Sequence, residues 1–531
     1  MQSRWSLDLT KRLFGWHTFA VMKLILRLFG LGTLLLTLGG CENKGEQGPS
    51  PAALSSFTST TDVDVLVVGA TPAGLIAGIA AADFDVSVLV VDSGPVAGGM
   101  ITGGLGGTDV GIGETIGGLS RTFFERVGQV YGTDLSWRFE PKVAAQVFGA
   151  WWEEAGVEVV GQRRLIRVEV EEGRAVRAHF VGGLTVSAKI MIDASYEGDL
   201  IAAAGIPFSV GRENREAFGE PLAGVSDPSF NRDLFPAGVR GVDASGRVLP
   251  FILSQPPGVT GTADAALPAY NYRLCLTQDP KLKLRFRKPE GYDRSNYALV
   301  EQCLAHPEMP KALGEWFTFL KLPGDKVDLN NRGALSTDLV GGNTGYLEAD
   351  EAGREAIRKK HRDYIEGLLY FLANDKSSPD WMRGRINTWG HSKDEFVDTG
   401  NWPHALYVRE GRRMQSDFVL TQRDVLVDRE KSDAVGMGSN FVESHHVRRY
   451  ATPAGDVQNE GFVHWRSVGR RPYDIPYRAL VPPRGSVSNV LVPVAVSSTH
   501  VGFSSVRMEP IYMILGESVG VAAAQALANN Q

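Results

Sequence analysis

Residues 64–92 constrain the fold of this chain more than any other stretch. The β-branched run at 63–68 is typical of a buried parallel strand, the Ala- and Leu-rich stretch at 72–84 of a helix, and 86–91 of a second strand. A strand, a helix and a second strand of this length form a right-handed βαβ unit. We therefore expect an α/β fold with a Rossmann-like, largely parallel sheet.

The turn between the first strand and the helix reads GATPAG and departs from the GxGxxG pattern, because Thr71 replaces the middle glycine. The context supports a nucleotide site, since N–H groups at a helix N-terminus bind pyrophosphate and an acid that ends the next strand accepts ribose hydroxyls. Thr71 keeps its backbone N–H, and its hydroxyl can add a phosphate contact. A Rossmann-like turn that binds nothing is the alternative. The predicted contacts are Gly69, Thr71, Pro72, Ala73, Gly74, Asp92 and Ser93.

A second glycine-rich segment follows at 94–109, with the sequence GPVAGGMITGGLGGTD. Glycines allow the backbone to pass close to a large ligand, and this segment is expected to run past the flavin end of FAD. An NAD-binding domain has no need of such a segment, so the sequence favours FAD over NAD. The predicted contacts here are Gly98, Gly99, Met100 and Thr102.

At this point the sequence resembles a known group, the FAD-dependent oxidoreductase family of largely bacterial proteins. The glycine turn of these proteins has the form GGTPAG and continues into GGMxTxGL. The resemblance extends over nearly the whole chain after residue 62. Its later landmarks are DASYEGDL at 193–200, AYNYRLCLT at 269–277, NRGALSTDLVGGN at 331–343, DTGNWPHALYVREGRRM at 398–414, PYDIPYRAL at 472–480 and STHVGFSSVRMEPIYMILGESVG at 498–520.

The resemblance implies a Rossmann-like FAD-binding domain of the glutathione-reductase-like class with an inserted substrate or cap domain. FAD would then lie between the first βαβ unit and the C-terminal segment. Asp193, Ala194 and Ser195 would pass its adenine–pyrophosphate side. Arg507, Met508 and Glu509 would lead into a last helix whose N-terminus points at the flavin pyrimidine ring, where the helix dipole stabilises negative charge. Glu509 has a second interpretation, as an acid that only complements the helix dipole.

A length of 531 residues argues for two or three structural units, because single cores rarely exceed about 250 to 300 residues. From about residue 220 the character changes to frequent Pro, Asp and Arg with few strand runs, although Ile357, Tyr364, Ile365, Leu368, Leu369 and Leu372 follow helical spacing. We predict the first part of the FAD-binding domain at 63–219, an α+β cap at 220–394 and a return to the core at 395–531. The last part is expected to hold a buried strand at 487–496 and a helix at 510–529.

The N-terminus predicts export. A basic stretch precedes the apolar run 28–38, and LGGC ending at Cys41 resembles the lipobox of bacterial lipoproteins. Residues 1–41 would be a lipoprotein signal peptide, the acylated Cys41 would anchor the protein to a membrane, and 42–62 would form a flexible tether. An uncleaved anchor helix is the alternative, but the run is shorter than the roughly 20 residues that span a bilayer. The predicted location is outside the cytoplasm, on the periplasmic side or at the cell surface.

Composition excludes few classes of protein. The net charge of -6 is mild and no basic cluster alternates with aromatic residues, so we expect no nucleic-acid partner. Cys275 and Cys303 remain after Cys41; they show no CxxC pattern and predict no metal site. They fit buried apolar positions, and an extracytoplasmic compartment would also permit them to pair.

Oxidation of a C–H bond beside oxygen or nitrogen needs a base for the hydroxyl or amine proton, and histidine is the side chain best suited to that near neutral pH. His500 is expected at the end of a buried strand just before the flavin-facing helix, and His445 lies in the family segment NFVESHHVRRY. Each is a candidate base or a hydrogen-bonded structural residue. Arg409 and Arg412, with Arg413, could clamp a carboxylate or polar substrate, or could form salt bridges with Glu410 and Asp417.

NAD(P)H is absent outside the inner membrane and the sequence has no second nucleotide motif, so an NADPH-dependent monooxygenase is disfavoured. The expected activity is an FAD-dependent oxidase or dehydrogenase that acts on a small, hydroxylated organic substrate such as a carbohydrate. Electrons would pass to dioxygen or to a periplasmic or membrane acceptor. A lipoprotein that retains FAD, or only the fold, without turnover is the alternative.

Overall fold

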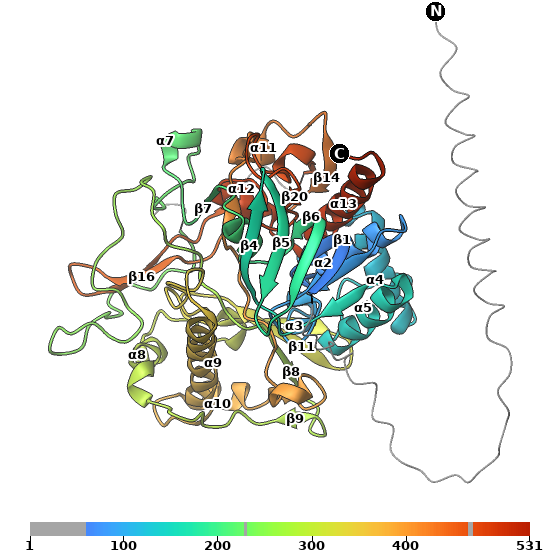
Figure 1. Cartoon of the computed structure of the whole chain (residues 1–531). Coiled ribbons are helices and arrows are strands. Elements are labelled where there is room, and N and C mark those ends of the chain that lie inside the picture. Colours follow the sequence, from blue (N-terminus) through green and yellow to red (C-terminus); the bar gives the residue numbers. More distant parts are fainter. Residues whose placement is uncertain (1–59, 228–230, 466–470) are drawn as a thin grey trace, which may run out of the picture. The chain divides into compact units, whose positions relative to one another are not determined.

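The computed structural model describes residues 60–227, 231–465 and 471–531, drawn in colour in Figure 1. The predicted signal peptide, with Cys41, and residues 42–59 of the predicted tether lie outside the described residues. The first strand begins at Thr60, so the end of the predicted tether is already part of the sheet.

The larger sheet is built on the predicted βαβ unit. Within the described residues its order is β3-β2-β1-β6-β5-β4, and β20 pairs with the carboxyl half of β6. β1, β2, β3, β6 and β20 run parallel, whereas β4 and β5 are antiparallel to their neighbours. The strands are β1 (Thr60–Val68), β2 (Val88–Val91), β3 (Glu158–Val160), β4 (Leu165–Glu171), β5 (Arg174–Phe180), β6 (Thr185–Asp193) and β20 (Val490–Leu491).

Alternation along β1 shows that both faces of this sheet are covered. Val65 and Val67 belong to an apolar core that includes the helices, whereas Leu66 and Val68 belong to a second core on the opposite face. A strand buried on both faces needs apolar side chains at successive positions. The predicted strand–helix–strand unit with its parallel pairing is therefore confirmed.

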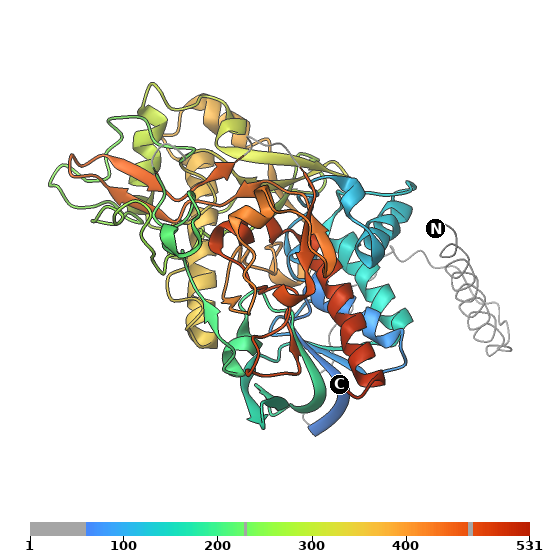
Figure 2. The same ribbon diagram turned by 90° about the horizontal axis from the view of Figure 1, so that it is seen from above.

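Helices cover one face of the sheet, and small residues bring two of them very close. A Cβ atom on Gly516 or Gly520 of the last helix would lie 2.3 Å from the carbonyl oxygens of Ala73 or Ala77. By length and composition this helix could cross a membrane. It is a core helix, because the side that carries Gly516 and Gly520 is buried. This helix is α13 (Glu509–Ala528), and Figure 2 shows it in dark red beside blue and cyan helices. It packs against α2 (Pro72–Ala82) and α4 (Gly118–Val130), and α5 (Pro141–Ala155) packs against both of these.

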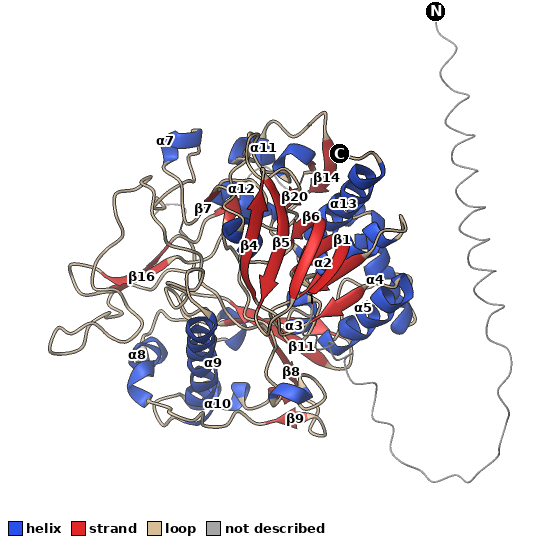
Figure 3. Cartoon of the chain, viewed as in Figure 1, coloured by secondary structure: helices blue, strands red, loops and turns tan. Residues whose placement is uncertain are grey.

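A second core lies in the predicted cap region. Within the described residues, an antiparallel sheet has the order β10-β11-β8-β12-β9 and shares one apolar core with helices of the cap (Figure 3). The predicted amphipathic helix is confirmed as α9 (Glu351–Asn374), which buries Ile365, Leu368, Leu369 and Leu372. The other elements are β8 (Leu274–Thr277), β9 (Lys283–Leu284), β10 (Phe317–Leu322), β11 (Lys326–Asn331), β12 (Gly390–Ser392), α8 (Ala298–Ala305) and α10 (Asp380–Ile386).

Two expectations are wrong in detail. The run 487–496 forms a strand only at Val490–Leu491, because Pro493 has no N–H to donate and the N–H of Val492 bonds to Leu480 instead. His500 does not directly precede the last helix, since it starts a separate helix, α12 (His500–Val506). The cap also contains more strand than its few apolar runs indicate.

Cys275 and Cys303 are free and buried. Burial raises the pKa of each thiol, as expected for cysteines at apolar positions. The domain boundaries at 219/220 and 394/395 stay predictions; Trp402, Leu406 and Val408, beyond the second boundary, pack into the cap core.

Candidate functional site

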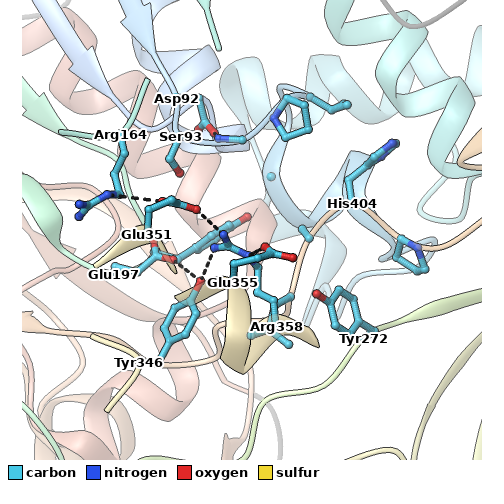
Figure 4. Close-up of a pocket in the computed structure, with 18 of the residues that line it drawn as sticks. Asp92, Ser93, Arg164, Glu197, Tyr272, Tyr346, Glu351, Glu355, Arg358 and His404 are labelled. Atoms are coloured by element: carbon cyan, nitrogen blue, oxygen red, sulfur yellow. Dashed lines mark hydrogen bonds and ion pairs between the residues drawn. The ribbon is translucent and has the colours of Figure 1, made fainter. Parts of the chain in front are cut away.

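A cavity with a volume of about 740 Å³ lies where β1 and β2 end. Its core side is lined by the turns that follow these strands, and its cap side by α9 and residues 399–406. Open α/β sheets bind their ligands at this edge. Figure 4 shows Asp92 and Ser93 from the core opposite Glu351, Glu355 and Arg358 from α9.

Six of the predicted cofactor contacts line this cavity: Gly69, Thr71, Asp92, Ser93, Gly99 and Ser195. The remaining ones lie outside its lining: Pro72, Ala73, Gly74, Gly98, Met100, Thr102, Asp193, Ala194, Arg507, Met508 and Glu509.

The glycine turn is held rigidly against β6. Gly69 has a φ of 101°, and a Cβ there would lie 2.7 Å from the carbonyl carbon of Ala194. Thr71 caps α2: its hydroxyl accepts the N–H of Gly74 at 3.3 Å and donates to the carbonyl of Ala194 at 2.8 Å. That hydroxyl is thus committed to the protein, and the free N–H groups of the first helical turn remain for an anion.

Asp92 joins the two glycine segments. Its Oδ2 accepts the N–H of Ala70 at 2.6 Å and its Oδ1 accepts the N–H of Gly94 at 2.6 Å. Burial raises the pKa of Asp92 although both hydrogen bonds lower it. Each oxygen has a further lone pair, so the carboxylate can still accept hydroxyls from a sugar in the cavity.

The second glycine segment turns through left-handed backbone into a short helix, α3 (Gly99–Gly103), because Gly98 and Gly99 have φ values of 103° and 51°. Met100 donates its N–H to the hydroxyl of Tyr196 at 3.0 Å. Thr102 donates its hydroxyl to the carbonyl of Ala97 at 2.8 Å, so its side chain secures the turn.

Asp193 at the end of β6 organises the loop that follows. It accepts the hydroxyl and the N–H of Ser195 at 2.7 and 3.1 Å, and the N–H of Ile201 at 2.8 Å. Burial raises the pKa of Asp193 to about 6. Its carboxylate is thus used inside the loop, while Ser195 reaches the cavity wall.

The cap closes the other side of the cavity through polar contacts that cross to the core. Arg164, ahead of β4, forms an ion pair of 3.4 Å with Glu351 of α9, and Tyr346 donates its hydroxyl to Glu197 at 3.3 Å. Arg358 bonds to Glu351 and to Tyr346 (Figure 4). Core and cap therefore share the walls of one site.

Glu509 begins α13 in a buried position. Its Oε1 accepts the hydroxyl of Tyr196 at 2.6 Å, and its Oε2 is buried without a partner. Burial raises the pKa of Glu509 to about 8, so the carboxyl is largely protonated at neutral pH. The hydrogen bond to Tyr196 goes beyond complementing the helix dipole, and it links α13 to Met100.

The predicted catalytic residues fall into three separate environments. His445 and Arg409 meet at Asp338, which accepts His445 Nδ1 at 3.2 Å and Arg409 at 3.0 Å. Burial and the charge of Arg409 lower the pKa of His445 to about 3. Burial alone would raise the pKa of Asp338, but Arg409 and His445 together lower it.

His500 lies in a different network. Its Nδ1 bonds to Glu410 at 2.8 Å and its backbone N–H to Glu213 at 2.9 Å, while Arg413 is paired with both acids. Burial and the charge of Arg413 lower the pKa of His500 to about 3.

Arg412 forms the third environment. It bonds to Asp199 at 3.1 Å and to the carbonyls of Glu197 and Leu347. Of the predicted acidic partners, Glu410 is correct for Arg413, but Asp417 pairs with Arg484 instead. The three arginines therefore do not form one clamp.

The residues around the cavity fit FAD. A helix N-terminus faces it, Asp92 is positioned beside it, and a Cβ on Gly94 would meet only Asp92 Oδ1 within 4 Å, which leaves backbone open to a ligand. This is the site of a dinucleotide-binding α/β flavoprotein. The chain matches the profile of the family described as FAD dependent oxidoreductase over residues 64–531. It belongs to that family: it is an FAD-dependent oxidoreductase and its cofactor is FAD.

Solved structures resemble only part of the chain. The myxobacterial chondrochloren halogenase CndH, an FAD-dependent halogenase, is 16% identical over 28% of this chain and 41% of its own, with a TM-score of 0.24. L-proline dehydrogenase from P. horikoshii is 12% identical over 29% and 59%, with a TM-score of 0.25. AlpK is 24% identical over 29% and 35%, with a TM-score of 0.23. These likenesses span less than two thirds of each structure, and no curated protein matches the chain.

Several site residues were not among those predicted. Asp338, which unites His445 and Arg409, lies in a landmark segment to which the sequence assigns no role, and Tyr196 follows Ser195 in a segment predicted only for the adenine side. Tyr346 and Glu351 reach the cavity because α9 packs against the core. Only the landmark segments of the family, which contain Asp338 and Tyr196, could have drawn attention to them.

Proposed function

We propose that this protein oxidises a small, hydroxylated organic substrate, such as a carbohydrate, as an oxidase or dehydrogenase, and that its fold is of the glutathione-reductase-like class. The proposed reaction is supported mainly by the buried cluster of Arg409, Asp338 and His445. The proposed fold class is supported by the parallel strands β3-β2-β1-β6-β20 with the antiparallel β4 and β5 beside β6.

FAD, when bound, supplies the acceptor for the hydride that leaves the substrate carbon. The glycine turn, the start of α2 and Asp92 would hold it. The protein must then remove the second hydrogen, the hydroxyl proton, so that the alcohol becomes a carbonyl. A neutral imidazole with a free lone pair serves this purpose.

His445 meets these requirements. Its Nδ1 lies 3.2 Å from the Asp338 carboxylate and 3.4 Å from the Asn331 amide nitrogen. We assign the proton of the neutral ring to Nδ1, because a carboxylate can only accept, and the lone pair of Nε2 is then left to accept the substrate proton. A pKa of about 3 keeps the ring neutral throughout the neutral range. Asp338 holds the ring orientation and stabilises the imidazolium as it forms.

We further propose an extracytoplasmic site of action, with a lipid anchor at Cys41 and electrons passing to dioxygen or to a periplasmic or membrane acceptor. The sequence pattern at 28–41 supports the anchor. Labelling of the expressed protein with a fatty-acid analogue, with Cys41→Ser as control, tests it: label on the variant contradicts the anchor.

The reaction is tested by anaerobic mixing of the FAD-loaded protein with sugars, alcohols and amines, while the flavin absorbance is followed. With a substrate that bleaches the flavin, His445→Gln should slow reduction by about 10²-fold or more, with FAD still bound.

His500→Gln is the matched comparison, because it removes a second buried histidine that is also held by a glutamate. In His500→Gln the substrate should reduce the flavin at nearly the wild-type rate, and the melting temperature of the variant should be lower than that of the wild type. If His500→Gln is slowed and His445→Gln is not, the base is His500. If no compound bleaches the flavin, the protein retains FAD without this turnover.

A further inference from the structure

Arg507 is a buried cation without an acidic partner. It is 7% exposed, and no carboxylate in the described parts of the chain lies within 4.0 Å of its guanidinium. Its hydrogen bonds go to the carbonyl of Glu443 at 2.9 Å and to the hydroxyl of Tyr407 at 3.5 Å. Neither neutral acceptor compensates the charge, and burying an uncompensated charge is costly.

A second guanidinium lies on the same tyrosine. Arg409 stacks on the ring of Tyr407, with its Cζ 5.0 Å from the ring centroid. Its Nε is buried and has no hydrogen-bond partner. Within the described residues Asp338 is the one acidic partner of Arg409, so the two arginines that contact Tyr407 share a single acid and an excess positive charge remains.

Other buried arginines of the described residues have an acidic partner or lie elsewhere in the fold. Arg212, Arg354 and Arg413 are each paired with at least one carboxylate. Arg449 has none, but it bonds to the side chain of Asn459 and the carbonyl of Ala334 inside the cap. Arg507 therefore combines an unbalanced charge with a place directly before α13 and beside the His445 cluster.

We propose that Arg507, Arg409 and the hydroxyl of Tyr407 form an oxyanion-binding subsite, and that the substrate of this enzyme carries a carboxylate or phosphate beside its oxidised hydroxyl carbon. The planar guanidinium groups offer paired donors that match both oxyanions. The Tyr407 hydroxyl accepts from Arg507, and its own hydrogen is left to donate. This inference rests on the proposed oxidation for its substrate class but not for its binding site.

Binding is tested without turnover by titrating the FAD-loaded protein with oxalate and with inorganic phosphate while the flavin spectrum is recorded. Wild type should show a saturable shift with at least one of them. Arg507→Gln should weaken that affinity by 10-fold or more, and Tyr407→Phe by several-fold. Arg507→Lys keeps the charge and should recover part of it. Arg449→Gln, which removes the other buried arginine without an acid, should bind as wild type does.

Substrate class is tested by comparing flavin reduction by glucose, gluconate and glucose 6-phosphate. Faster reduction by an anionic member supports the inference and identifies the oxyanion. The inference is overturned if neither probe shifts the spectrum, if Arg507→Gln and Arg507→Lys bind as tightly as wild type, or if glucose is the best reductant. In the last case the proposed oxidation stands. If an anion binds but no compound reduces the flavin, the proposed oxidation is contradicted and the oxyanion-binding subsite is still supported.

Discussion

Replacement of Lys326 by Met is a stringent test of how core and cap hold together. Lys326, on β11 of the cap sheet, has a side chain that is only 1% exposed. Its Nζ donates to Glu140 at 2.6 Å, to Asp394 at 2.8 Å and to Glu395 at 2.7 Å. Glu140 precedes α5 of the core, so this single ammonium group joins the core to the cap.

Lys326→Met removes the central cation and keeps an apolar stem of similar length. Three carboxylates whose oxygens lie within 4.8 Å of one another then remain. Lys142, which is 42% exposed, still contacts Glu140 and Asp394, but among the described residues no other cation is paired with Glu395. Breaking a buried ion pair by removing one partner costs about 3–5 kcal/mol.

The size of the effect on melting follows from the length of the folded part. Unfolding entropy of about 2.1 cal/mol/K per residue gives about 1 kcal/mol per kelvin for the roughly 470 residues from Thr60 to the end. Lys326→Met should therefore lower the apparent melting temperature by about 3–5 °C. Differential scanning fluorimetry of the FAD-loaded protein measures it, with Lys142→Met as the partly exposed control expected to lose about 1 °C or less.

Two conditions should rescue the variant. The carboxylates left without Lys326 prefer the protonated form, so their pKa in the folded state rises. The loss of unfolding free energy is therefore largest above neutral pH and shrinks as pH falls toward 5. Ca²⁺ or Mn²⁺ should also restore stability, since clustered carboxylates are ligands for these ions. The melting temperature of the wild type should not change when the cation is added. An unchanged melting temperature in Lys326→Met at pH 7.5, or equal stabilisation of both proteins by the cation, would refute the reasoning.

Asp92→Ala should raise the dissociation constant of FAD by about 10- to 100-fold, as expected when charged hydrogen bonds worth about 1.5–3 kcal/mol are lost; fluorescence of released FAD measures it, and unchanged affinity contradicts the role. Gly69→Ala should lower the free energy of unfolding by about 1–3 kcal/mol from the φ of 101° alone, and by more because the new Cβ overlaps Ala194, so the variant should lose both stability and FAD. Gly156→Ala, whose new Cβ has nothing within 4 Å, should lose only modest stability. Buried histidines should make the fold acid-sensitive: folded pKa values of about 3 or 4 lie below the unfolded 6.5, so their stabilisation is complete above 6.5 and is lost as pH falls toward 4. Each such group costs about 2 kcal/mol at pH 5; a flat melting temperature between pH 7 and 5 would contradict this. The histidines concerned are His361, His391, His445, His446 and His500.

The nucleotide-binding half of the fold could be predicted because its causes are local. Successive apolar residues, a glycine turn and a terminal acid define a βαβ unit within residues 63–92, and both cores confirm it. The cap sheet could not be predicted in this way. β11 reads KVDLNN, and its Lys326 and Asp328 are buried only because partners far away in sequence neutralise them. A pattern of hydrophobic spacing contains no information about such partners.

The catalytic candidates show the same limit at the level of single side chains. His445 and His500 have the same ring, similar burial and the same pKa direction, and they differ only in whether an aspartate or a glutamate network holds them. Neither Asp338 nor Glu410 lies near its histidine in the sequence. Residue type identified the two histidines, and tertiary contacts alone separate their roles.

The arginines of the segment YVREGRRM show the same limit. Neighbours in sequence suggest one clamp, but this stretch is extended, so Arg409, Arg412 and Arg413 reach three different acids. Each of these three arginines therefore has an acid that balances its charge. Arg507, from the segment predicted to serve the flavin, has no carboxylate within 4.0 Å among the described residues, and Tyr407 brings it to Arg409. Charge balance in the folded protein, rather than spacing in the sequence, is what distinguishes a structural arginine from one that awaits an anion.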